Sequence, residues 1–297
     1  MAQTLLERYR VFKRNTGMSD RVVSQNIGFS QTVISQWLNG KYTGNTVEVE
    51  KALTEFLNVQ DDRIIFGKIT VPFVATENAK MISAVIRRAQ LDKNIALIIG
   101  DSGTGKTYGI ENWVSKFQRS SILIRVNVTF NPKILISELH KVLGLGGHGS
   151  KNSMLTDCIK TLKDTDRVVI IDEADLLSVS SIEMMRALHD ESGIGIVMLG
   201  LPEIAEAVRG SRGELARINT RIANFSRLKS LSIEDTASIT STLIPDSDAF
   251  AKVFYTLSKG NGRVLGNLLK NVVRVHKETN HEITNKFIEK CFEMQHR

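Results

Sequence analysis

A glycine-rich stretch and an acidic stretch carry the residue types that bind and hydrolyse nucleoside triphosphates. GDSGTGKT, at residues 100–107, follows an apolar run and has the spacing of a phosphate-binding loop. Its glycines let backbone amides at the start of a helix approach phosphate oxygens. The lysine reaches the β- and γ-phosphates, and the threonine hydroxyl ligates Mg²⁺. We therefore expect ATP and Mg²⁺ at Gly100, Asp101, Ser102, Gly103, Thr104, Gly105, Lys106, Thr107 and Tyr108.

The acidic stretch VVIIDEAD, at residues 168–175, supplies the second half of the expected site. Asp172 ends a buried apolar run, and open α/β sheets bind ligands at that edge. We expect its carboxylate to hold Mg²⁺ through water. Glu173 is placed to polarise a water that attacks the γ-phosphate, so Glu173 and Lys106 predict hydrolysis of ATP to ADP and phosphate. The alternative, in which Glu173 and Asp175 only cap a following helix, remains open.

The elements that must position these motifs alternate between short apolar runs and helical stretches. The apolar runs, at residues 95–100, 121–128, 167–172, 194–200 and 221–228, are typical of buried strands. Helical stretches between them predict an α/β fold, with a parallel sheet as the middle of three layers. The strands stop near Lys229, and the rest of the chain predicts an all-α unit.

An extra strand between the loop strand and the acidic strand, together with the Asp-Glu pair, resembles the AAA+ branch of P-loop ATPases. The resemblance implies an arginine finger that reaches a neighbouring subunit's γ-phosphate, at Arg217 or Arg221, with Arg221 preferred. It also implies that Arg263, at the start of a C-terminal helix, binds the nucleotide. The chain departs from the family at Gly200 and Leu201, where the first sensor is usually Asn or Thr. Hydrolysis is therefore expected to be slow or to use another group.

The N-terminal segment at residues 22–42 resembles a helix-turn-helix of the phage-repressor type. Small Ser24 lets two helices cross closely, and Gly28 supplies the turn. The second helix, at about residues 31–38, would enter the major groove of DNA. It carries no arginine for bidentate guanine recognition, which disfavours sequence-specific reading. The residues expected to contact DNA are Gln31, Thr32, Ser35, Gln36, Lys41 and Tyr42.

Composition limits the classes of protein that this chain can be. The net charge of +7 over 297 residues favours a polyanionic partner. Cys158 and Cys291 are far apart, so neither a disulfide framework nor a zinc site is supported. The first residues lack a signal-peptide core, and no apolar stretch approaches the roughly 18 residues that span a bilayer. These features predict a cytoplasmic protein without a membrane partner.

The patterns divide the chain into four parts. We predict a helix-turn-helix domain at residues 1–65, a linker and leading helix at 66–94, an AAA+ core at 95–228 and a helical lid at 229–297. The linker is placed in residues 58–78, which lose helical periodicity and contain Gly67 and Pro72.

The order of these domains, with the segments VVIIDEADLL, ARINTRIA and GNGRVLGNLLK, resembles the transposition B proteins of transposable phages over nearly the whole chain. This resemblance implies a largely nonspecific DNA-binding ATPase that forms ATP-dependent helical filaments on duplex DNA in the bacterial host cytoplasm. Such a protein delivers target DNA to a DDE transposase, stimulates strand transfer and takes part in target immunity. Lys133 and Lys151, expected on loops after strands, are candidates for DNA contacts inside the filament.

Two other functions fit the same motifs. A transcription regulator would read an operator with the helix-turn-helix and use the ATPase as a switch, which requires a specific palindromic site and a fixed oligomer. A helicase-loader-like ATPase would act on a replicative helicase. A module without catalysis is disfavoured because Lys106, Thr107, Asp172 and Glu173 are all present.

Overall fold

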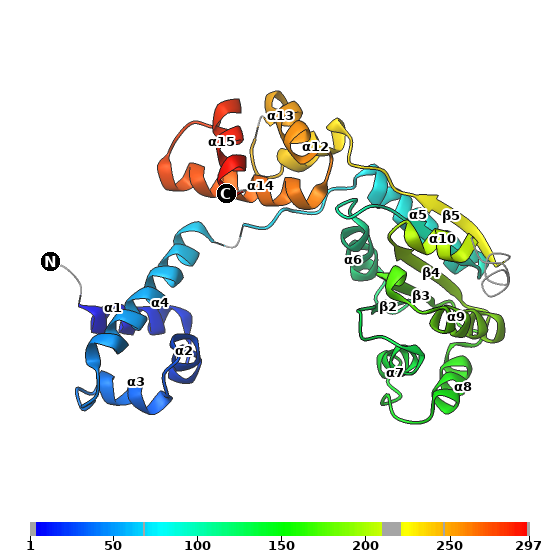
Figure 1. Ribbon diagram of the computed structural model, residues 1–297, viewed down its shortest axis with the longest axis horizontal. Coiled ribbons are helices and arrows are strands. Elements are labelled where there is room, and N and C mark those ends of the chain that lie inside the picture. Colours follow the sequence, from blue (N-terminus) through cyan, green and yellow to red (C-terminus); the bar gives the residue numbers. More distant parts are fainter. Residues whose placement is uncertain (1–3, 68, 210–220, 246, 296–297) are drawn as a thin grey trace. The chain divides into compact units, whose positions relative to one another are not determined.

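The computed structural model describes residues 4–67, 69–209, 221–245 and 247–295. The chain divides into two compact units, Met1–Thr70 and Val71–Arg297, each with its own helices (Figure 1).

The first unit is helical and consists of α1 (Leu5–Thr16), α2 (Asp20–Ile27), α3 (Gln31–Leu38) and α4 (Thr46–Phe66). Each helix begins after a residue whose side chain accepts a hydrogen bond from a first-turn amide. The turn between α2 and α3 contains Gly28 at φ 76°, in the left-handed region. Ser24 is buried, and Ile34 of α3 lies in the core of this unit beside Tyr9, Val23 and Leu53.

Helix α4 is longer than the sequence suggested. The loss of helical periodicity expected from residue 58 is wrong for residues 58–66, because α4 continues to Phe66. Leu53, Leu57 and Gln60 continue the buried face of α4 at helical spacing. Arg8 of α1 also donates to Asp61 of α4 from Nε at 3.0 Å, which ties this stretch to the rest of the unit.

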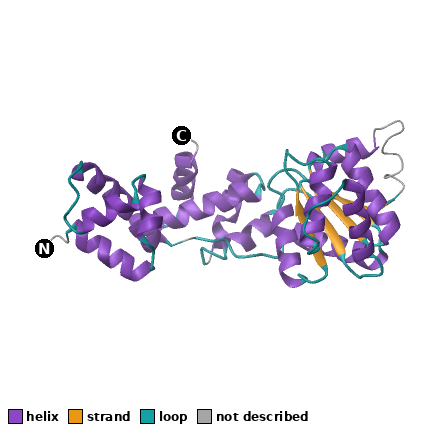
Figure 2. Ribbon diagram, turned by 90° about the horizontal axis from the view of Figure 1, so that it is seen from below, coloured by secondary structure: helices purple, strands orange, loops and turns teal. Residues whose placement is uncertain are grey.

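The second unit is built on a five-stranded parallel sheet in the order β2-β3-β4-β1-β5. The strands are β1 (Ile95–Ile99), β2 (Ser121–Arg125), β3 (Val168–Asp172), β4 (Gly195–Gly200) and β5 (Ile222–Arg227). Helices lie on both sides of the strands (Figure 2), which confirms the predicted α/β class.

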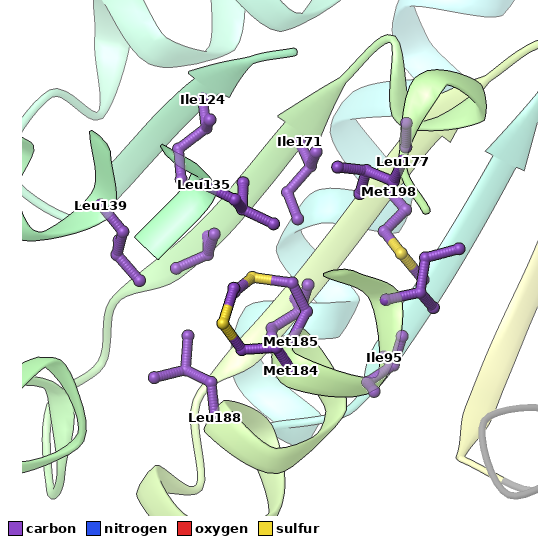
Figure 3. Close-up of a cluster of buried hydrophobic side chains, with 14 of the residues drawn as sticks. Ile95, Ile124, Leu135, Leu139, Ile171, Leu177, Met184, Met185, Leu188 and Met198 are labelled. Carbon is purple, nitrogen blue, oxygen red and sulfur yellow. The ribbon is translucent and has the colours of Figure 1, made fainter. Parts of the chain in front are cut away.

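Alternate residues of β1 face the two sides of the sheet. Ile95, Leu97 and Ile99 pack with helices α7 (Pro132–Val142), α8 (Lys151–Leu162), α9 (Val179–Ser192) and α10 (Glu203–Arg209). Figure 3 shows side chains of α7 and α9 gathered against β2, β3 and β4 in this layer. Ala96 and Ile98 pack on the other side with helices α5 (Glu77–Asp92) and α6 (Lys106–Lys116).

The chain after Lys229 is helical, as predicted. It forms α12 (Ile233–Thr240), the short 3-10 turn η2 (Ser247–Phe250), α13 (Ala251–Ser258), α14 (Gly262–Thr279) and α15 (Asn285–Gln295). Helix α14 buries an apolar stripe that includes Leu265, Leu269 and Val272. Within the described residues, no helix has the length and apolar character that crossing a membrane requires.

Candidate nucleotide-binding site

The glycine-rich loop connects β1 to α6 at the carboxyl end of β1. Gly103 and Gly105 have φ angles of 88° and 89°, in the left-handed region that favours glycine. A Cβ on Gly100 would lie 2.9 Å from the Leu228 Cβ, so this position has no room for a side chain. The N-cap residue of helix α6 is Gly105, which has no side chain to accept a hydrogen bond from the first turn. The first amides of α6 are therefore left for an anion, as at other helix N-termini that bind phosphate.

Lys106 folds back onto this loop. Its ammonium donates to the carbonyls of Gly100 and Asp101, the latter at 3.1 Å. Burial lowers the pKa of Lys106, Arg263 adds to that shift, and the carboxylates of Asp172, Asp175 and Asp101 oppose it. Charged groups from the acidic stretch and from α14 therefore converge on the lysine of the loop.

Thr107 contacts the acidic strand directly. Its hydroxyl donates to Oδ2 of Asp172 at 2.9 Å, and Asp172 is only 2% exposed. The other oxygen, Oδ1, accepts from the Glu173 amide at 3.1 Å. A hydroxyl beside a carboxylate is a pair of oxygen donors of the kind that Mg²⁺ uses together with water and phosphate oxygens.

Glu173 turns the chain sharply out of β3. It is exposed and has φ 58° and ψ 39°, a left-handed conformation that is costly for a residue with a side chain. The short 3-10 turn η1 (Ala174–Leu176) follows at once. Strained backbone at the end of a sheet strand is often found at functional sites.

Asp175 contacts the residue that follows β4. This contact could not be predicted from the sequence. Oδ1 of Asp175 accepts from the Leu201 amide at 2.9 Å. A Cβ on Gly200 would lie 2.6 Å from the same oxygen, so a larger residue would collide with Asp175. An Asn or Thr at position 200 would therefore collide with Asp175 in this arrangement.

The start of α14 lies against the glycine-rich loop. Nδ2 of the Asn261 side chain donates to the carbonyl of Ser102 at 2.9 Å, and the backbone amide of Gly262 donates to that of Gly103 at 2.8 Å. Arg263 follows on the first turn of α14 and is exposed. A cavity of about 370 Å³ lies between residues 101–104 of the loop and the ends of α13 and α14. An Asn before a helix predicts a cap, but no sequence signal indicated this loop contact.

Tyr108 is turned toward the segment that precedes α5. Its hydroxyl donates to the Val71 carbonyl at 2.6 Å, and its ring stacks on Phe73 with centroids 5.6 Å apart. The side chain is 43% exposed. Tyr108 thus fixes residues 71–73 beside the phosphate loop.

Arg221 lies away from the residues described so far. It directly precedes β5, whose first residue Ile222 pairs with Ile95 at the start of β1. The phosphate loop follows the carboxyl end of β1, so Arg221 and Lys106 lie at opposite ends of the parallel strands. Arg221 donates from Nε to Asp190 of α9 at 3.0 Å. Arg217 lies outside the described residues.

The two lysines expected on loops after strands are on helices instead. Lys133 is the second residue of α7, after Pro132, and Lys151 is the first residue of α8, after the glycine-rich turn that follows α7. Asn131 and Ser150 cap these helices, so the two lysines fall in first turns and not in loops. Both lysines are exposed, as are Gln31, Thr32, Ser35, Gln36 and Lys41 of the first unit, whereas Tyr42 is half-buried.

A family model described as an AAA domain matches residues 88–208. With the sheet order and the phosphate loop, this match defines the fold of the core: a P-loop α/β fold of the AAA+ type. The fold resembles the ORC2 protein of Aeropyrum pernix, solved as ADPNP–ADP complexes, with a TM-score of 0.56 and 14% identity. That match covers 78% of this chain and 71% of the ORC2 chain.

Sequence comparison leads to more particular relatives. The chain is 24% identical over 231 residues to the Mu-like prophage FluMu DNA transposition protein B of Haemophilus influenzae, covering 76% of this chain and 80% of that protein. It is 27% identical over 213 residues to the ATP-dependent target DNA activator B of Escherichia phage Mu, covering 68% of this chain and 66% of that protein. These matches confirm the resemblance to the transposition B proteins.

Proposed function

We propose that this chain is an ATP-dependent target-DNA activator, an AAA+ ATPase that assembles on duplex DNA and presents it to a DDE transposase. The observation that carries the proposal is the position of Arg221 at the opposite end of the strands from the phosphate loop, where it does not reach a nucleotide bound to its own loop and is free to reach one bound to a second subunit. The names of the two relatives, a transposition protein and a target DNA activator, support the choice of pathway.

Within one subunit, the proposal assigns a role to each group around the loop. The Lys106 ammonium binds the β- and γ-phosphates, and the Thr107 hydroxyl with the Asp172 carboxylate holds Mg²⁺. The metal supplies charge neutralisation at the phosphate oxygens. Glu173 orients and deprotonates the attacking water, and Arg263 binds the nucleotide from α14. The Thr107–Asp172 contact supports this arrangement because it already places the two metal-binding groups together.

Between subunits, Arg221 would contact the γ-phosphate bound by a neighbour. ATP then bridges two copies of the chain, and repetition of that bridge gives a filament. Hydrolysis removes the phosphate that the arginine contacts, which weakens the interface and releases DNA. In the single subunit Arg221 forms an ion pair with Asp190. On assembly Arg221 would either leave Asp190 for the γ-phosphate or bind both groups together.

DNA contact is proposed for two sets of residues, all of them exposed except the half-buried Tyr42. One set lies on and after α3: Gln31, Thr32, Ser35, Gln36, Lys41 and Tyr42. The other is Lys133 and Lys151, on the first turns of α7 and α8. The net charge of +7 supports a polyanionic partner, and phosphate contacts of this kind bind DNA with little sequence preference. The proposed place of action is the cytoplasm of a bacterial host.

The α2–α3 pair also fits a second function, that of a transcription regulator that binds an operator. Electron microscopy of the protein on random-sequence duplex DNA, with ATP, with ADP and without nucleotide, separates the two. For the parent protein on DNA we expect filaments with ATP but not with ADP or without nucleotide. For Lys106→Ala and Arg221→Ala we expect no filaments in any of the three conditions. Discrete particles on one DNA sequence, independent of nucleotide, would favour the regulator.

A further inference from the structure

Three successive carbonyls of the phosphate loop are bound by donors from outside it. The Ser102 carbonyl accepts from Nδ2 of Asn261 at 2.9 Å, and the Gly103 carbonyl accepts from the Gly262 amide at 2.8 Å. The Thr104 carbonyl accepts from Nδ2 of Asn78 at 2.9 Å. Because C=O and N–H point in opposite directions across a trans peptide, these bonds fix where the next three amides of the loop point.

Asn261 makes two kinds of bond with one side chain. Its Oδ1 accepts from the amides of Arg263 and Val264, at 3.0 and 3.2 Å, and so caps α14. Its Nδ2 donates to Ser102, which lies 159 residues earlier in the chain. The same amide group therefore joins the helix that carries Arg263 to the loop that binds phosphate.

The loop has room for this contact because position 103 is glycine. A Cβ there would lie 2.1 Å from Oδ1 of Asn261 and 2.3 Å from its Cγ. Gly103 thus meets two requirements, a positive φ of 88° and the close approach of the α14 cap.

Asn78 anchors the loop from the other side. It is 6% exposed, and its Nδ2 also donates to the Lys229 carbonyl at 2.7 Å, where β5 leads into the lid helices. Its Oδ1 accepts from the Lys229 amide at 3.4 Å. With Thr104 fixed here, Asn261 is the side chain through which α14 acts on the loop.

We propose that Asn261 is a positioning residue of the nucleotide site, which holds the phosphate loop in its receiving shape and couples that shape to α14. The inference rests on the proposed nucleotide chemistry. Loss of the Asn261 donor would misalign amides that contact phosphate in both ADP and ATP. It would therefore weaken ground-state binding of both nucleotides and leave the chemical step unchanged.

Substitution by serine isolates the loop contact from the cap. Serine caps helices about as well as asparagine, but its shorter side chain cannot cap α14 and reach Ser102 together. Asn131→Ser is the matched control, because Asn131 caps α7 through the Ile134 amide. Among the described residues, no other hydrogen bond joins the Asn131 side chain to the backbone. Asn261→Asp is a second variant that keeps the cap and loses the donor.

The test measures steady-state ATP hydrolysis and the affinity of a fluorescent ADP analogue. For Asn261→Ser and Asn261→Asp we expect KM and the ADP dissociation constant to rise about tenfold, which corresponds to about 1.4 kcal/mol. We expect kcat within about twofold of the parent protein, and Asn131→Ser unchanged. Thermal unfolding without nucleotide should show both serine variants folded, with a slightly lower midpoint for Asn261→Ser, since both retain a cap and only Asn261→Ser loses the bond to Ser102.

Equal KM values for Asn261→Ser and Asn131→Ser would overturn the inference and leave Asn261 as a helix cap. A fall in kcat at unchanged KM would also overturn it. Failure of the parent protein to bind either nucleotide would instead remove the proposed function on which the inference stands.

Discussion

The Thr107 hydroxyl donates to Oδ2 of Asp172 at 2.9 Å and joins two motifs that lie 65 residues apart in the chain. The contact places a hydroxyl and a buried carboxylate side by side. It follows from the parallel sheet, because β1 and β3 both end at the edge where the loop and the acidic stretch emerge.

Removal of the Thr107 hydroxyl should therefore raise the Mg²⁺ requirement. For Thr107→Ala we expect the Mg²⁺ concentration at half-maximal ATP hydrolysis to rise about tenfold or more, since one of the two side chains proposed to hold the metal is lost. Thr107→Ser retains the hydroxyl and should stay within about twofold. Magnesium titration of hydrolysis measures both variants, and an unchanged midpoint for Thr107→Ala would contradict the assignment.

Glu173→Gln should separate nucleotide binding from hydrolysis. The amide keeps the shape of the side chain but cannot accept a proton, so kcat should fall about 10²-fold or more. The affinity for ATP should be retained, and the protein should stay on duplex DNA once ATP is added. Filter binding with Lys106→Ala as the comparison measures this, because Lys106→Ala should lose nucleotide binding. Equal loss of DNA binding in both variants would count against the proposed cycle.

The trans role of Arg221 can be tested by mixing two inactive proteins. Arg221→Ala lacks the finger but keeps its own loop, whereas Glu173→Gln cannot hydrolyse ATP but offers Arg221 to a neighbour. Each should be inactive alone, and an equal mixture should recover hydrolysis, because an Arg221→Ala site can lie next to an intact arginine. An inactive mixture would place the arginine in its own subunit's site or outside catalysis.

The same substitution should cost little stability. Arg221 is 51% exposed at its side chain, and Asp190 keeps a second partner without it, because Arg186 donates from Nη1 to the other carboxylate oxygen. Exposed ion pairs contribute about 0–1 kcal/mol, so the thermal unfolding midpoint of Arg221→Ala should stay close to that of the parent.

The strands were predictable because a strand buried on both faces appears as an uninterrupted apolar run, as in β1, β3 and β4. The end of β2 could not be predicted, because the apolar run at residues 121–128 continues past Arg125, the last residue of the strand. There Oδ1 of Asn127 accepts from the Thr129 amide at 2.9 Å and turns the chain. Lys106, Asp172 and Glu173 could be proposed as site residues because each lies in a contiguous motif.

Contacts that depend on tertiary packing gave no local signal in the sequence. Asn78 and Asn261 approach the loop from 26 and 159 residues away, and each looks like an ordinary first-turn or capping asparagine in its own segment. Asp175 could be recognised as part of the acidic motif, but its contact with Leu201 could not be predicted. That contact depends on β3 lying beside β4, which is set by the order of strands in the sheet.

Asp175 should support hydrolysis through the end of β4. Asp175→Ala leaves the Leu201 amide without its acceptor, which costs about 1–3 kcal/mol where such a group is buried, and it removes a negative charge near Lys106. Asp175→Asn keeps an oxygen acceptor and removes only the charge. We expect a larger loss of both stability and kcat for alanine than for asparagine. Thermal unfolding and steady-state hydrolysis would show it, and equal losses would assign the effect to charge alone.

Asp20 should make the first unit sensitive to acid. Burial alone would raise the pKa of Asp20, but hydrogen bonds from Lys13 and Tyr9, both at 2.6 Å, and the charge of Lys13 outweigh it, so the net shift is downward. A carboxyl whose pKa is lower in the folded state stabilises the protein above its unfolded pKa, near 3.9. That stabilisation is lost as the pH falls through the lower folded value. Asp20→Asn should therefore unfold at a lower temperature than the parent protein at pH 7, with the difference shrinking toward pH 3. Thermal unfolding monitored across this range measures the effect, and a difference that stays constant with pH would show that ionisation of Asp20 does not contribute.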